Sequence, residues 1–206
     1  MIAIVDYGAG NLGSVRNALA WLGLASRIAG DGAGLEAAGA IIFPGVGAAG
    51  PAMAELRRRG LDVAIRDALE RGAAYLGICL GLQLLFEASA EDHSRCLGIV
   101  PGRVERMEGP GKIPHVGWNT IERVRLHPVL EGLEGRAAYF SHSYAVRPRE
   151  RGVVAGTTTH GARFVSVIAQ GRLVGVQFHP ERSGPVGLGV LERFARFAAA
   201  RAARCC

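Results

Sequence analysis

In the first half of the chain, short apolar runs alternate with segments in which apolar residues recur at helical spacing. Residues 11–22 are an example, because the side chains at 12, 15, 18, 19 and 22 are apolar and would share one helix face. Strands and helices alternate in this half, so we expect an α/β fold with a mostly parallel, doubly wound sheet and helices on both faces. Strands are predicted at 2–5, 25–29, 40–43 and in the run that ends at Cys79. Further helices are predicted at 51–59, at 61–71 and from just after Cys79 to about Ala88.

The second half of the chain consists mainly of strand-like runs with turn residues between them. We expect several of these runs to pair antiparallel and to extend the sheet or form a ribbon beside it. No repeat or linker divides the 206 residues, a length that is ordinary for one α/β core, so a single domain is expected over 1–206. The runs lie at 98–106, 115–124, 137–146, 153–159, 162–169 and 172–178, after a polar loop at 89–95, and a closing helix is predicted from about Val186 to Arg201.

Composition and charge narrow the classes of function. Apolar residues make up 49% of the chain, but Gly, Pro or Arg interrupts each run well before the roughly 18 residues of a membrane span, so none is expected. No basic region precedes the first apolar run, which argues against a signal peptide and for the cytoplasm. The net charge is +6, but the arginines are scattered and only 6% of residues are aromatic, so no nucleic-acid partner is expected.

The cysteines and the N-terminal glycines give no sign of a metal or cofactor. The cysteines at 79, 96, 205 and 206 form no pair with metal-ligand spacing, so neither a disulfide framework nor a metal site is expected. Gly8, Gly10 and Gly13 have the spacing of a dinucleotide fingerprint, but no acidic residue follows at the end of a second strand. We therefore expect no bound cofactor.

One cysteine lies where an apolar strand meets an apolar helix. Cys79 follows the run 75–78, with Gly77 and Gly81 on either side. This arrangement is typical of a nucleophile elbow, a sharp turn that presents the side chain at the carboxyl edge of a sheet. The N-terminus of the following helix would favour the thiolate. The alternative is that Cys79 is a small buried hydrophobe, as many free cysteines are.

Two other segments supply groups that a cysteine nucleophile needs. The run Gly175–Phe178 ends in His179-Pro180-Glu181. Residues two apart in an extended strand point the same way, so His179 and Glu181 can act as base and orienting carboxylate. The glycine-rich loop at 43–50 directly follows a strand, and its N–H groups can point at an anion, although a plain turn is the alternative.

Together these segments resemble the class I, or triad, glutamine amidotransferases, and more closely the family of glutaminase subunits of imidazole glycerol phosphate synthase. The resemblance covers nearly the whole chain. The elbow at 77–81 and His179-Pro180-Glu181 are typical of the superfamily, whereas 114–119 and 140–144 indicate the narrower family. Further matching segments are Asp6–Asn11, Pro44–Ala48 and Gln177–Gly184.

The resemblance implies an enzyme that hydrolyses glutamine to glutamate and ammonia. Cys79 would attack the side-chain amide to form a glutamyl thioester, His179 would move the proton, and Glu181 would hold the imidazole. Backbone N–H groups would stabilise the oxyanion; elbow geometry indicates Leu80, and the loop offers Gly47 or Val46. By family position, the amino-acid end of the substrate would be held by Gln83, His142, Ser143 and Tyr144.

The resemblance also implies a protein partner. In this family the ammonia passes to a cyclase subunit that makes imidazole glycerol phosphate and an aminoimidazole carboxamide ribonucleotide in histidine biosynthesis, which predicts a heterodimer. Trp118 could be an interface anchor or a core residue on a strand. Ala49 stands where the family often has an aromatic residue, which leaves the packing of the loop open. The docking surface would include Asn11, Lys112, Pro114, His115 and Trp118.

Three other functions stay open from the residues. A triad glutaminase of a different synthase would carry the same elbow and His-Pro-Glu segment. A catalytically silent binding module could keep the fold, although intact Cys79, His179 and Glu181 argue against it. A cysteine peptidase-like hydrolase is the third. The first requirement for any of the enzymes is that the three side chains meet in space.

Overall fold

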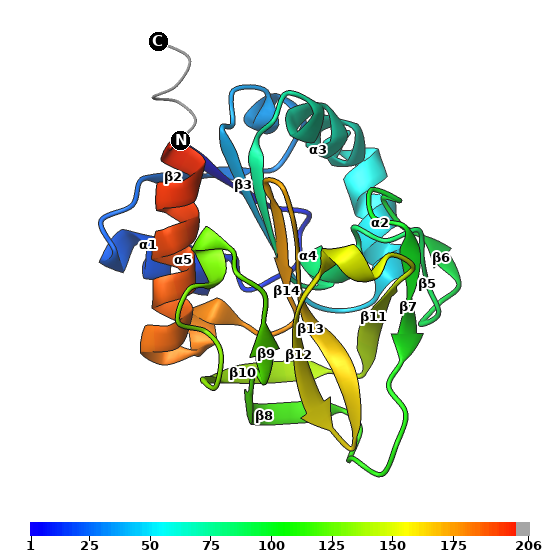
Figure 1. Ribbon diagram of the computed structural model, residues 1–206. Helices are drawn as coiled ribbons and strands as arrows, with labels where there is room; N and C mark the ends of the chain where they lie inside the picture. Colours follow the sequence, from blue (N-terminus) through cyan, green and yellow to red (C-terminus); the bar gives the residue numbers. More distant parts are fainter. Residues whose placement is uncertain (201–206) are drawn as a thin grey trace.

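A large mixed sheet runs through the centre of the molecule, and its first part is parallel (Figure 1). The computed structural model describes residues 1–200, apart from the side chain of Arg123. Four of the five parallel strands are buried along their whole length, as expected where helices cover both faces. In spatial order the strands are β2 (Ser26–Ala29), β1 (Ile2–Val5), β3 (Ala40–Gly45), β4 (Ala74–Cys79) and β14 (Leu173–Val176).

The second half of the chain continues this sheet with mostly antiparallel strands and adds a separate ribbon, as predicted. Beyond β14 come β13 (Ala162–Gln170), β11 (Tyr144–Pro148), β7 (Gly102–Arg106), β5 (Ala88–Ser89) and β6 (Ser94–Arg95), while β12 (Val154–His160) pairs with β13 and β9 (Arg123–Val124). The ribbon joins β8 (His115–Thr120) to β10 (Ala137–His142).

Helices cover both faces of the sheet, which confirms the doubly wound arrangement (Figure 1). On one face, α1 (Leu12–Trp21) and α5 (Gly184–Ala199) share an apolar core. On the other face, α2 (Ala49–Arg58) and α3 (Leu61–Glu70) bury their apolar sides in a second core. No helix within residues 1–200 is long and apolar enough to cross a bilayer. The predicted helix end at Arg201, and Cys205 and Cys206, lie outside the described residues.

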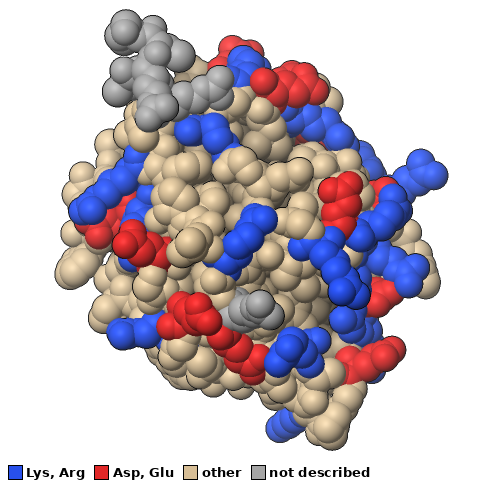
Figure 2. All heavy atoms as spheres, in the orientation of Figure 1, with Lys and Arg blue, Asp and Glu red and all other residues tan. Residues whose placement is uncertain are grey.

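Short 3-10 helices complete the backbone between these elements. They are η1 (Ala33–Leu35), η2 (Pro128–Leu130), η3 (Arg151–Val153) and η4 (Pro180–Arg182). On the face drawn in Figure 2, basic and acidic side chains are interspersed. Ion pairs within residues 1–200 include Arg59 with Glu55 and Arg149 with Glu87. Part of the positive charge is therefore paired locally.

The helix after the elbow is much shorter than predicted. Its apolar pattern predicted a helix to about Ala88, but α4 comprises only Leu80–Gln83. The carbonyl groups of Leu84, Leu85 and Phe86, which a longer helix would use internally, instead accept hydrogen bonds from N–H groups of residues 97–100. Because residues 97–100 make these contacts, the strand predicted at 98–106 begins only at Gly102. The predicted polar loop at 89–95 contains Ser89 of β5 and the whole of β6.

Two long predicted strands are each divided between different sheets. The run at 137–146 breaks at Ser143, because β10 pairs in the ribbon whereas β11 pairs with β7. The run at 115–124 breaks after Thr120, since the next residue pairs its N–H with the carbonyl of Arg136 and the chain then joins β12. Neither break coincides with a glycine or a proline, so the sequence pattern did not reveal them.

At Gly81 the backbone of the elbow packs directly against the backbone of β3. A substitution at Gly81 tests this close contact. A Cβ at Gly81 would lie 1.9 Å from the carbonyl oxygen of Phe43, which is backbone and cannot rotate away. We expect Gly81→Ala to lower the free energy of unfolding by at least about 3 kcal/mol in urea titrations. Gly13→Ala is the control, because a Cβ there meets nothing within 4 Å and should leave stability unchanged or raise it by up to about 1 kcal/mol. Equal stability of the two variants would contradict this packing.

Candidate active site

Cys79 lies on a strained turn at the carboxyl edge of the sheet. It ends β4 and precedes α4, with φ 53° and ψ −107°, a conformation that a residue with a side chain rarely adopts. Its side chain faces a pocket of about 520 Å³. This geometry is that of the predicted nucleophile elbow and differs from that of an inert core cysteine. Of the predicted site residues, the pocket is lined by Asn11, Val46, Gly47, Cys79, Leu80, Gln83, His142, Ser143, Tyr144 and His179.

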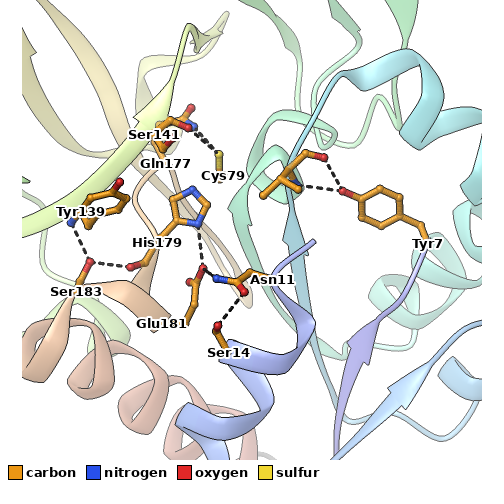
Figure 3. Close-up of polar contacts among 11 residues, drawn as sticks. Tyr7, Asn11, Ser14, Cys79, Tyr139, Ser141, Gln177, His179, Glu181 and Ser183 are labelled. Atoms are coloured by element: carbon orange, nitrogen blue, oxygen red, sulfur yellow. Dashed lines mark hydrogen bonds and ion pairs between the residues drawn. The ribbon is translucent and has the colours of Figure 1, made fainter. Parts of the chain in front are cut away.

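The three predicted triad side chains come together at this pocket. Figure 3 shows the ring of His179 between the sulfur of Cys79 and the carboxylate of Glu181. The Nδ1 of His179 lies 3.0 Å from Oε1 of Glu181, so its Nε2 faces the sulfur. The strand before His179 ends at Val176, earlier than predicted, and Glu181 lies in η4 rather than in an extended strand. The short turn still brings the ring and the carboxylate into contact.

The environment of His179 favours the protonated ring. Burial by itself would lower the pKa of His179, but hydrogen bonds to Cys79 and Glu181, together with their charges, raise it to about 10. The side chains of His179 and Glu181 are only 6% and 1% exposed, so water screens their interaction little. The arrangement therefore places a readily protonated imidazole beside the sulfur, which is the base that a cysteine nucleophile requires.

Asn11 has a contact in the site that its sequence position did not predict. Its Nδ2 lies 3.4 Å from Oε1 of Glu181, and its Oδ1 accepts a hydrogen bond from Ser14 (Figure 3). The start of α1 thus helps to orient the carboxylate behind His179. The other carboxylate oxygen, Oε2, is buried and has no hydrogen-bond partner among the described residues.

The structure distinguishes between the two loop amides that were predicted for an oxyanion. The N–H of Val46 donates to the hydroxyl of Tyr7 at 3.1 Å, and that hydroxyl donates to the carbonyl of Val46 at 3.0 Å (Figure 3). Burial raises the pKa of Tyr7 to about 12, which keeps this hydroxyl protonated. The Val46 amide is therefore engaged, whereas the N–H of Gly47 has no hydrogen-bond partner within residues 1–200. Gly47 and Leu80 both border the pocket.

The predicted substrate residues form one wall of the pocket. Gln83 is 5% exposed, and its Nε2 donates to the carbonyl of Tyr144 at 3.0 Å. The same carbonyl accepts from Nδ1 of His142 at 2.8 Å. These side chains are thus engaged within the wall, while Ser143 and Tyr144 also line the cavity.

The predicted interface residues separate into an exposed and a buried group. Trp118 is 60% exposed on β8, which excludes the alternative that it is a core residue. Lys112 and Pro114 are also exposed. His115 is only 3% exposed, because side chains on β8 alternate between the two faces of the ribbon. Its prediction as a surface contact is therefore wrong.

Four pocket or triad neighbours were missed in the sequence. Glu91 lines the pocket from the predicted polar loop, where no local pattern distinguishes it. Gln177 contacts the sulfur, and its position directly after a strand was the available signal. Tyr7 lies in the matching segment 6–11 without a predicted role. Arg182 lines the pocket and places its guanidinium 4.1 Å from the ring centre of Tyr139.

Comparison with known proteins gives the class of the chain. A family model described as "Glutamine amidotransferase class-I" matches residues 3–196. A crystal structure of a glutamine amidotransferase shares the fold with a TM-score of 0.77, at 23% identity, over 97% of this chain and 100% of the other. A structure of PurLQS from Thermotoga maritima gives 0.72 at 19% identity, over 95% of this chain and 97% of the other. The fold and the family model agree on the class I glutamine amidotransferases.

Curated relatives narrow this class. A protein of Moorella thermoacetica is 48% identical over 94% of this chain and 93% of its own length, and one of Dehalococcoides mccartyi is 44% identical over 96% and 98%. Both are named imidazole glycerol phosphate synthase subunit HisH. The chain therefore belongs to the HisH family within the class I glutamine amidotransferases, as its resemblance indicated.

A group of buried histidines behind the pocket wall predicts how stability depends on pH. Burial and the neighbouring His160 lower the pKa of His115 to about 4. Burial lowers the pKa of His142 to about 3, against the effect of its bond to the Tyr144 carbonyl. Repulsion by His115, His179 and His160 lowers it further. Between pH 6.5 and these pKa values, the two histidines bind protons in the unfolded chain but not in the folded chain. Their contribution to the free energy of unfolding is therefore fully present above pH 6.5 and is lost as the pH falls.

We therefore expect His142→Gln to reduce this loss of stability between pH 6.5 and 5, above the range in which most carboxylates titrate. Each buried histidine contributes up to about 1.4 kcal/mol per pH unit, and removing one should remove that slope. Urea unfolding at several pH values measures it. His93→Asn, at an exposed loop position, should keep the original slope. An unchanged slope in His142→Gln would show that this ring titrates normally.

Proposed function

We propose that this chain hydrolyses glutamine to glutamate and ammonia, and that it delivers the ammonia to the cyclase subunit of imidazole glycerol phosphate synthase in histidine biosynthesis. The observation that carries the proposal is the position of His179 between the sulfur of Cys79 and the carboxylate of Glu181, at a pocket of about 520 Å³. We place the reaction in the cytoplasm, with no cofactor.

In the first step, the thiolate of Cys79 attacks the amide carbon of glutamine, and the electron pair of the C=O bond moves to oxygen. The imidazolium of His179 then gives its proton to the departing ammonia, leaving a glutamyl thioester. Neutral His179 next takes a proton from water, which attacks the thioester, and the sulfur leaves as thiolate. Glu181 keeps Nδ1 protonated throughout, so Nε2 is always the nitrogen that exchanges the proton.

Two backbone amides of the pocket fit the oxyanion that forms in both steps. We assign Leu80 N–H, directly after the nucleophile, and Gly47 N–H, in the loop after β3. Val46 is the weaker candidate, because its N–H is held by Tyr7. An amide that is already bonded to a neutral hydroxyl would have to break that bond before it could bind the oxyanion, whereas preorganised donors stabilise it at no such cost.

Glu91 is the acidic side chain of the pocket, and we propose that it binds the α-ammonium group of glutamine. Burial raises the pKa of its carboxyl, Asp92 raises it further, and a hydrogen bond from the Ala49 N–H opposes both. A carboxylate in such surroundings gains from a cationic partner. The walls formed by Ser143 and Tyr144 would then receive the α-carboxylate.

The proposed cyclase would contact the exposed face of β8. Trp118 and Val116 are 60% and 57% exposed there, and Lys112 and Pro114 are exposed just before the strand. Apolar and aromatic side chains of this kind are common anchors in stable interfaces. Asn11 would lie near the same surface while it holds the triad carboxylate, so it is proposed as a contact only in addition to that role.

The first test is Cys79→Ala. Without the sulfur no thioester can form, so we expect glutamine hydrolysis in the presence of the cyclase subunit to fall by at least about 10⁴-fold, while binding to that subunit stays intact. Glutamate release and a titration of the complex measure the two properties. Cys96→Ala is the control, because Cys96 is equally buried but does not line the pocket. Substantial turnover by Cys79→Ala would exclude Cys79 as the nucleophile, and peptide cleavage by the isolated chain would favour the peptidase alternative.

The second test is Glu91→Gln. Loss of a charged hydrogen bond to the α-ammonium group should raise KM for glutamine by roughly 10- to 150-fold with a smaller effect on kcat. Steady-state kinetics of the complex measure both constants. Glu108→Gln, an exposed position outside the pocket, should leave KM unchanged. A normal KM in Glu91→Gln would mean that another group holds the ammonium.

A further inference from the structure

Gln177 places a buried amide group against the nucleophilic sulfur. It is 0% exposed and follows β14, whose last paired residue, Val176, lies opposite Ile78 of β4. The next residues of the two strands are Gln177 and Cys79, so they leave the sheet side by side. Nε2 of Gln177 lies 3.5 Å from Sγ of Cys79, within hydrogen-bond reach of sulfur (Figure 3).

The direction of this amide is determined by its neighbours. The carbonyl of Tyr144 can only accept, so the atom of Gln83 that lies 3.0 Å from it must be nitrogen. The same Nε2 of Gln83 lies 3.1 Å from Gln177, so the atom of Gln177 that faces it must be the oxygen. The amide nitrogen of Gln177 therefore points at the sulfur and carries a hydrogen toward it.

We propose that Gln177 is a further catalytic residue, whose side-chain N–H donates a hydrogen bond to the thiolate of Cys79. The proposal rests on the function proposed above. The thiol form of Cys79 can donate to the carbonyl of Ser141, 3.9 Å from the sulfur, whereas the thiolate can only accept. Gln177 thus favours the charged form and also the thiolate that leaves when the thioester is hydrolysed.

The geometry gives the sulfur two donors, one from each side. His179 is the donor that exchanges its proton during the reaction, whereas the amide of Gln177 keeps its hydrogen at every pH of interest. The titratable groups that interact with the charge of the sulfur are His179 and Tyr7, and the Tyr7 hydroxyl stays protonated. A hydrogen bond to a charged acceptor changes an equilibrium by roughly 10- to 150-fold, which would move the titration of Cys79 by about one pH unit or more.

The alternative is that Gln177 only satisfies the buried Gln83. That role predicts lower stability and an unchanged titration of the sulfur. Gln177→Met in the full chain tests the difference, because methionine has a similar length and no N–H donor. The rate at which iodoacetamide alkylates the peptide containing Cys79 is followed against pH by mass spectrometry, and glutamine turnover is measured with the cyclase subunit.

We expect the midpoint of the alkylation profile to rise by about one pH unit or more in Gln177→Met, and kcat at pH 7 to fall roughly 10- to 150-fold with little change in KM. Gln177→Glu keeps the acceptor for Gln83 but puts a charge against the sulfur, so its midpoint should rise further for that reason alone. If Gln177→Met does not fold, Gln177→Leu, which also removes the N–H without adding a charge, decides the question. Thr158→Val is the control, since it removes a fully buried hydrogen bond to Ser166 away from the sulfur.

An unchanged midpoint in the folded variants overturns the proposal and leaves Gln177 with a structural role. A midpoint that also rises in Thr158→Val overturns it too, because a general loss of packing would then explain the shift. The alkylation profile does not depend on turnover. If the unchanged chain releases no glutamate with the cyclase subunit, the proposed function fails, and the profile still tests the donor.

Discussion

The parallel pairing of β4 with β14 is the constraint on which the site depends. These strands are far apart in the sequence, yet their register places Val176 opposite Ile78, so the two chains leave the sheet next to each other. One continues into the elbow of Cys79, and the other into Gln177 and His179. Both faces of these strands are buried, so a shift by one residue would move each side chain into the core on the opposite face of the sheet. Packing in the two cores therefore fixes the register.

Close backbone contacts bring the third segment to this place. A Cβ at Gly45 would lie 2.7 Å from Cβ of Leu80, and one at Gly77 would lie 2.5 Å from the carbonyl oxygen of Gly81. The loop after β3 can therefore lie directly against the elbow, with Gly47 beside the nucleophile. Tyr7 then holds the loop through both backbone groups of Val46. Glycine is needed at these positions because any side chain would push the segments apart.

A second set of contacts connects the exposed ribbon to the pocket. Asn119 contacts Nε2 of His115 at 3.2 Å, and Nδ1 of His115 lies 3.1 Å from Nε2 of His142. His142 and Gln83 both donate to the carbonyl of Tyr144. Because that carbonyl can only accept, Nδ1 of His142 must donate to it, which leaves Nε2 of the neutral ring as an acceptor. Nδ1 of His115 then donates to this Nε2, so His142 and His115 are both neutral donors through Nδ1. The pocket wall and the ribbon thus form one hydrogen-bonded unit.

The sequence by itself determined the alternation of elements, the elbow and the His-Pro-Glu segment, because periodicity, glycines and a short motif are local properties. It did not determine that α4 ends after four residues, that Ser143 separates two sheets, or that Val46 is engaged while Gly47 is not. Tertiary structure decided these points. Each depends on hydrogen bonds or packing between segments that are distant in the chain. The periodicity of apolar residues reports only local structure, so it does not show such contacts.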